Sequence, residues 1–85
     1  SSYAIYVREA AVAPASYVDA TPPVFDGRPI AFRAFDEQGM LQTAALALPG
    51  QADEKIRMLL DDPAIAYIHA HNAAHGCFSA RIDRD

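Results

Sequence analysis

The segment AIAYIHAHNAAHGCFSARIDR, residues 64–84, decides the fold, because polar and apolar residues alternate in two short runs. Side chains along a β-strand point alternately to the two faces of a sheet, so residues of one parity share a face. Residues 64–71 and 76–83 therefore predict the two strands of a hairpin. The even positions are apolar: Ala66, Ile68, Ala70, Phe78, Ala80 and Ile82. The odd positions carry polar or ionisable groups: Tyr67, His69, His71, Cys77, Ser79, Arg81 and Asp83.

A connection formed by residues 72–76 puts both apolar sets on one face. This register places His71 opposite Cys77, His69 opposite Ser79 and Tyr67 opposite Arg81. Directly opposed Cβ atoms lie about 4.5–5.5 Å apart. Because a slip by one residue would move one apolar set to the polar face, we expect this register.

The polar patch allows three interpretations, and the first is a metal site. His69, His71 and Cys77 form a ligand set that suits zinc or iron, with a fourth position left to water. In the second interpretation, Cys77 is a nucleophile activated by His71, and Asn72 orients the imidazole ring. A small molecule would then bind to the remaining polar groups: Asn72, Ser79, Arg81 and Tyr67.

The third interpretation is a solvated sheet face, which is ordinary in antiparallel sheets. The protein would then be a non-catalytic interaction module. Its uncovered face or an edge strand would mediate self-association, for instance as a homodimer.

The preceding residues predict further strands, a loop and one helix. Residues 2–8 predict a strand, and residues 30–35 and 40–48 predict a hairpin whose turn contains Gly39 at positive φ. Prolines at positions 14, 22, 23 and 29 predict that residues 10–29 form one long loop without a central strand. Residues 51–62 predict a helix with Asp53 as its N-cap. This helix would connect two strands and make the sheet mixed.

Other side chains are assigned to the core or to solvent. The apolar stripe of the helix, Ile56, Leu59 and Leu60, is expected to face the sheet. We interpret Arg57 as solvated. Arg8 and Arg33 could bind an anion, but we interpret them as solvated or salt-bridged. The aromatic residues interpreted as core are Tyr3, Tyr6, Phe25, Phe32 and Phe35.

Composition limits both the architecture and the partners. The 85 residues are 52% hydrophobic and 21% charged, which is typical of one folded domain spanning residues 1–85. A net charge of -4 with seven Lys+Arg residues argues against nucleic acid and anionic membrane surfaces. The single cysteine excludes an internal disulfide. No apolar run reaches the roughly 20 residues that a membrane span needs.

Three stretches resemble a known family: SSYAIYVRE at residues 1–9, FRAFDEQGML at 32–41 and YIHAHNAAHGCFSARIDR at 67–84. They are similar to the C-terminal part of an uncharacterised bacterial family, a domain of unknown function. The His-x-His-Asn-x-x-x-Gly-Cys motif at residues 69–77 is the most specific part of this resemblance. The resemblance implies a bacterial, cytoplasmic protein and a further N-terminal segment in a longer chain. It implies no catalytic roles.

Together the sequence predicts an α+β domain. We expect a mixed or antiparallel sheet of about five strands with one helix packed on one face. The expected function is binding of a small molecule or metal ion through the patch on the last hairpin, as an enzyme or as a binding domain.

Overall fold

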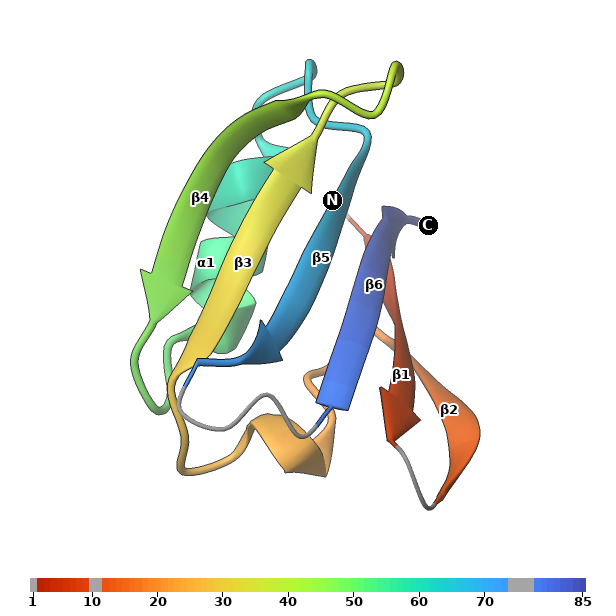
Figure 1. Cartoon of the computed structure of the whole chain (residues 1–85), viewed down its shortest axis with the longest axis vertical. Helices are drawn as coiled ribbons and strands as arrows, with labels where there is room; N and C mark the ends of the chain where they lie inside the picture. The colour runs from red at the N-terminus through yellow and green to blue at the C-terminus, as the bar shows by residue number, and fades with distance from the viewer. Residues whose placement is uncertain (1, 10–11, 74–77) are drawn as a thin grey trace.

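The computed structural model describes residues 2–9, 12–73 and 78–85 (Figure 1). Its elements are β1 (Tyr3–Glu9), β2 (Val12–Val18), the 3-10 helix η1 (Pro23–Phe25), β3 (Ile30–Phe35), β4 (Leu41–Ala47), α1 (Ala52–Leu60), β5 (Tyr67–Asn72) and β6 (Phe78–Arg84). No helix among the described residues is long and apolar enough to cross a membrane.

The six strands form one antiparallel sheet in the order β2-β1-β6-β5-β3-β4. The predicted α+β class is confirmed, with six strands rather than five. Of the two expected alternatives, mixed or antiparallel, the sheet is antiparallel, although α1 does connect β4 to β5. Both of these strands pair with β3, which lies between them, so no parallel ladder forms.

The sixth strand is β2, which lies inside the segment predicted as a loop. It pairs with β1 through Ile5 opposite Tyr17 and Val7 opposite Ala15, and the register then shifts before Glu9. Proline is tolerated in edge strands and at irregularities of a ladder, and β2 is an edge strand. Pro14, the one proline within β2, is therefore compatible with a strand at this edge of the sheet.

The last hairpin keeps the predicted faces but has a different register. His71 lies opposite Ser79, not Cys77, and His69 lies opposite Arg81. The shift is by two residues, so parity is preserved. It arises because β5 continues through Asn72, which pairs with Ile30 of β3, and the connection begins only at residue 73.

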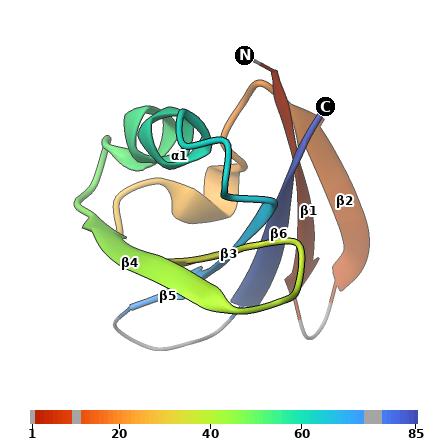
Figure 2. The same ribbon diagram turned by 90° about the horizontal axis from the view of Figure 1, so that it is seen from above.

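One side of the sheet and α1 share the hydrophobic core. The buried helix residues Ile56, Leu59 and Leu60 belong to one cluster with residues of β1, β3, β4, β5 and β6. Figure 2 shows α1 and η1 on the inner side of the curved sheet. Full burial of a side chain such as Ile68, which is 0% exposed, contributes about 1.5–3 kcal/mol to stability. Burial against this shared core therefore fixes which strand parity faces inward.

The start of α1 differs from the prediction. Gln51, not Asp53, is the N-cap residue, and it makes no side-chain capping bond to the helix. Its side-chain oxygen instead accepts a hydrogen bond from the backbone N–H of Leu48, at 3.0 Å. Asp53 lies in the first turn, where a carboxylate still interacts favourably with the helix dipole.

Candidate functional site

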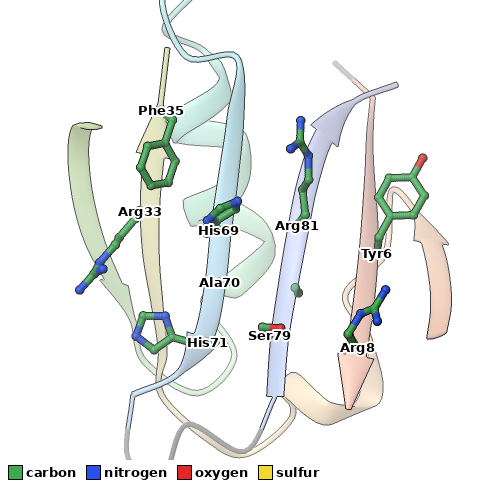
Figure 3. Close-up of a pocket in the computed structure, with 10 residues that line it drawn as sticks. Tyr6, Arg8, Arg33, Phe35, His69, Ala70, His71, Ser79 and Arg81 are labelled. Carbon is green, nitrogen blue, oxygen red and sulfur yellow. The ribbon is translucent and has the colours of Figure 1, made fainter. Parts of the chain in front are cut away.

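The side of the sheet that faces away from α1 carries most of the predicted site residues. We call it the open face. Most of its charged, aromatic and hydroxyl-bearing side chains come from four neighbouring strands: Tyr6 and Arg8 (β1), Ser79, Arg81 and Asp83 (β6), Tyr67, His69 and His71 (β5), and Arg33 and Phe35 (β3). Figure 3 shows most of them projecting from the strands on this side.

Strand register aligns these side chains in two rows. In the first, which we call the Arg8 row, Arg8 lies opposite Ser79, and Ser79 lies opposite His71. In the second, the Tyr6 row, residues Tyr6, Arg81, His69 and Arg33 lie opposite one another in that order. The two rows are adjacent, because their members on one strand, such as Tyr6 and Arg8 on β1, are two residues apart, a distance of about 7 Å along the strand.

A shallow depression of 430 Å³ lies over both rows. Its lining residues are Tyr6, Arg8, Arg33, Phe35, His69, Ala70, His71, Ser79, Ala80 and Arg81. The small side chain of Ser79 lies between the longer Arg8 and His71, which leaves space above it. The depression therefore brings guanidinium, imidazole and hydroxyl groups to one hollow.

Charge on the open face is unevenly compensated. Arg81 pairs with Asp83, at 3.0 Å between Nη2 and Oδ1. Within residues 2–9, 12–73 and 78–85, no hydrogen bond or ion pair engages the side chain of Arg8 or Arg33. The face thus carries three arginines against one aspartate, in a chain whose net charge is -4. Positive charge is concentrated where the depression lies.

An aromatic cluster borders the depression. The rings of Phe35 and Tyr67 stack at 5.1 Å between centroids, with an interplanar angle of 16°. His69 lies 5.0 Å from Phe35 and 5.3 Å from Tyr67. The guanidinium carbon of Arg81 lies 4.3 Å from the Tyr67 ring centroid, a cation–π contact. Tyr67 therefore contributes packing that positions Arg81 and His69.

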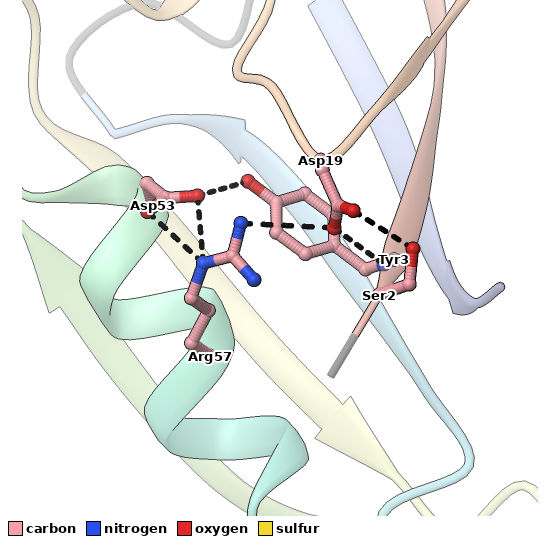
Figure 4. A network of polar contacts seen from close by, with 5 residues as sticks. All are labelled: Ser2, Tyr3, Asp19, Asp53 and Arg57. Carbon is pink, nitrogen blue, oxygen red and sulfur yellow. Dashed lines mark hydrogen bonds and ion pairs between the residues drawn. The ribbon is translucent and has the colours of Figure 1, made fainter.

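A separate polar network joins β1 to α1 (Figure 4). The buried Tyr3 donates a hydrogen bond from its hydroxyl to Asp53, and Arg57 contacts the same carboxylate at 3.1 Å. Arg57 also lies 3.6 Å from Asp19, which accepts hydrogen bonds from Ser2 Oγ and the Tyr3 backbone N–H. The interpretation of Arg57 as merely solvated is therefore wrong.

Hydrogen bonds in this network shift the protonation of its members. The pKa of Asp53 is lowered, first by the hydroxyl of Tyr3 and then by Arg57, against the opposing effect of partial burial. The pKa of Asp19 is lowered by the hydrogen bonds from Ser2 and the Tyr3 backbone. Burial, and then the hydrogen bond to Asp53, raise the pKa of Tyr3. The network thus combines a neutral tyrosine with ionised carboxylates. It stabilises the contact between β1 and α1 and is not part of the open face.

The structure brings together five of the predicted site residues. They are Tyr67, His69, His71, Ser79 and Arg81. Asn72 does not join them, because it is 3% exposed and lies on the core side of β5. Cys77 and the neighbouring His75 lie outside the described residues.

The metal and nucleophile hypotheses both depend on Cys77, so they stay predictions. Among the described residues, no group of three or more His, Cys, Asp or Glu side chains is arranged to hold a metal ion. His69 and His71 remain neighbours on one face of β5.

Four charged or aromatic residues that line the depression were not among the predicted site residues: Tyr6, Arg8, Arg33 and Phe35. Tyr6 is 51% exposed on the open face, so its assignment to the core is wrong, and Phe35 is only half-buried. The alternation within residues 3–8 contained the signal, since Tyr3, Ile5 and Val7 are buried and Tyr6 and Arg8 are exposed. The core assignment of Tyr3, Phe25 and Phe32 is confirmed.

The fold and the open face define a small α+β domain with a surface depression lined by arginine side chains. The chain belongs to the family described as "Protein of unknown function (DUF1203)", whose model matches residues 1–84. The predicted membership of an uncharacterised family is thus confirmed. A search among curated proteins found no match, and a search among solved structures found none either.

Proposed function

We propose that the open face binds a small anionic ligand through a phosphate or carboxylate group. The observation that carries this proposal is that Arg8 and Arg33 line the depression without a carboxylate partner among the described residues. Arginine matches the planar geometry of carboxylates and phosphates with paired N–H donors. Each of these uncompensated guanidiniums, on β1 and on β3, therefore favours an anion from solution.

The Arg8 row supplies three different donors to one anion. Arg8 offers its guanidinium, Ser79 a hydroxyl, and His71 a ring N–H, and the three lie on adjacent strands. The 430 Å³ depression falls within the range of about 300–1,000 Å³ that is typical of small-molecule sites. The ligand is expected to bind reversibly, with an affinity that falls as salt is added.

Titration with inorganic phosphate tests this function. Backbone amide signals of β1, β5 and β6 should shift in NMR spectra, and Arg8→Gln should weaken binding about tenfold, because it removes a charge-assisted hydrogen bond. Lys55→Gln is the matched control, since it removes one positive charge from α1, on the other side of the sheet. Equal affinities for the two variants, or shifts confined to other elements, would refute the proposal.

A second candidate function is self-association through β4. This edge strand, Leu41–Ala47, contains neither charge nor proline, and Leu41 and Leu46 are 56% and 52% exposed. Edge strands of monomeric proteins usually carry charge, proline or bulges that prevent pairing, and β4 has only a register shift near Leu41. A second copy could pair with β4 about a two-fold axis.

Sedimentation measurements test this second candidate. We expect a concentration-dependent dimer that Leu46→Lys dissociates. Met58→Lys is the control, because Met58 is 55% exposed on α1 and the substitution adds the same charge away from the edge. A monomer at all concentrations, or equal effects of the two lysines, would refute association through β4.

A further inference from the structure

The Tyr6 row places exposed rings beside the anion-binding groups. Tyr6 and Arg8 are two residues apart on β1, and both project from the open face (Figure 3). His69 and His71 have the same relationship on β5. Each ring therefore lies about 7 Å along its strand from a donor of the Arg8 row. A ligand that bridges the two rows would contact a ring with one end and an anion-binding group with the other.

Of the five open-face rings, His71 belongs to the Arg8 row, and two of the other four are available for a ligand. Phe35 and Tyr67 stack on each other, and Tyr67 also contacts Arg81. By contrast, Tyr6 is 51% exposed, with no ring contact to another described residue, and His69 is exposed and meets its neighbours at tilted angles. The available rings are thus those that flank Arg81 in the Tyr6 row.

We infer that the anionic ligand of the open face is a free nucleotide, an inference that rests on the proposed function. Its phosphate binds the Arg8 row, at Arg8 and Ser79, and its base stacks on Tyr6, the ring on the same strand as Arg8, with the sugar between the rows. Stacking on an aromatic side chain tolerates any base and contributes substantially to affinity. The net charge of -4 favours a mononucleotide over a long nucleic acid strand, which would add many negative charges near an acidic protein.

Four probes measured by isothermal calorimetry and NMR test the ligand class: inorganic phosphate, adenosine, adenosine monophosphate and a short single-stranded oligoadenylate. Adenosine monophosphate should bind at least about tenfold more tightly than phosphate, and adenosine alone only weakly. The ring signals of Tyr6 and His69 should shift with the nucleotide but not with phosphate. The oligoadenylate should bind no more tightly than the mononucleotide.

Substitutions at Tyr6 separate the ring from the anion site. Tyr6→Leu should abolish the preference for the nucleotide over phosphate, whereas Tyr6→Phe should keep the preference because it keeps the ring. Urea unfolding of both variants verifies the fold, because substitution of this exposed residue should leave the unfolding midpoint nearly unchanged.

The outcomes distinguish the nucleotide inference from the proposed anion-binding function on which it rests. Phosphate binding without a nucleotide preference, or a preference that survives Tyr6→Leu, would overturn the nucleotide inference and leave the anion site intact. Absence of binding by both phosphate and nucleotide would refute the proposed function as well. Binding of the oligoadenylate at least about tenfold more tightly than the mononucleotide would assign the site to a nucleic acid strand instead.

Discussion

Tyr3→Phe should destabilise the protein by removing one hydroxyl between β1 and α1. The ring of Tyr3 is 0% exposed, and its hydroxyl donates a hydrogen bond to the carboxylate of Asp53. Phenylalanine keeps the buried ring in place, so the substitution isolates the hydrogen bond. It also removes a donor that lowers the pKa of Asp53.

The expected magnitude follows from the charge and exposure of the partner. A hydrogen bond to a charged group contributes about 1.5–3 kcal/mol. The side chain of Asp53 is 50% exposed, so water can hydrate the carboxylate once the hydroxyl is gone. We therefore expect a loss near or just below the lower limit of this range, about 1–2 kcal/mol. For a domain of this size, that loss lowers the melting temperature by about 5–15 °C.

Urea unfolding followed by circular dichroism measures this loss. Tyr6→Phe is the matched control, because it removes the same hydroxyl from the same strand, where the side chain is 51% exposed. The control should change stability by less than about 0.5 kcal/mol. If the two variants lost equal stability, or if Tyr3→Phe lost less than about 0.5 kcal/mol, the hydroxyl would not join the strand to the helix as argued.

Three further outcomes are expected. The Tyr3 hydroxyl lowers the pKa of Asp53, so the stability that this hydrogen bond contributes is present above about pH 4 and is lost as the pH falls through the lowered pKa. Urea unfolding between pH 2 and pH 6 should therefore show that Tyr3→Phe loses less stability on acidification than the wild type. Parallel curves for the two proteins would contradict this. Gly39→Ala should destabilise by about 1–2 kcal/mol in thermal unfolding, because Gly39 has φ 79°, and an unchanged melting temperature would exclude strain in the β3–β4 turn. Asp83→Asn should tighten phosphate binding several-fold in calorimetry, because it releases Arg81 from its ion pair, and weaker binding would count against an anion site.

The alternation of polar and apolar residues correctly predicted which side chains of the last hairpin share a face. It could not predict which residues pair across the two strands. Polarity at Tyr67, His69 and Arg81 is enough to separate the two faces, since parity needs no knowledge of the neighbouring strand. The register, by contrast, depends on how far β5 extends along β3, as the pairing of Asn72 with Ile30 shows. A shift by two residues preserves every face, so hydrophobic patterning could not detect it.

The candidate site was predicted only in part for a similar reason. Alternation in residues 3–8 could have placed Tyr6 and Arg8 on the exposed side of the first strand. It could not have placed that strand beside Ser79 and Arg81, because the pairing of β1 with β6 joins distant parts of the sequence. The strand β2 was missed because prolines were interpreted without knowing that this strand lies at an edge.

The adjacency of β1 and β6 has a consequence for how the protein forms in the cell. Ile5 pairs with Ile82, so β1 is synthesised well before the strand with which it pairs. Two-state domains dominated by such distant pairings fold slowly, because the loop-closure entropy is lost before the contacts form. On the ribosome, β1 and β2 would emerge as an isolated hairpin with unsatisfied edges, and a chaperone that shields nascent chains should raise the yield of native protein.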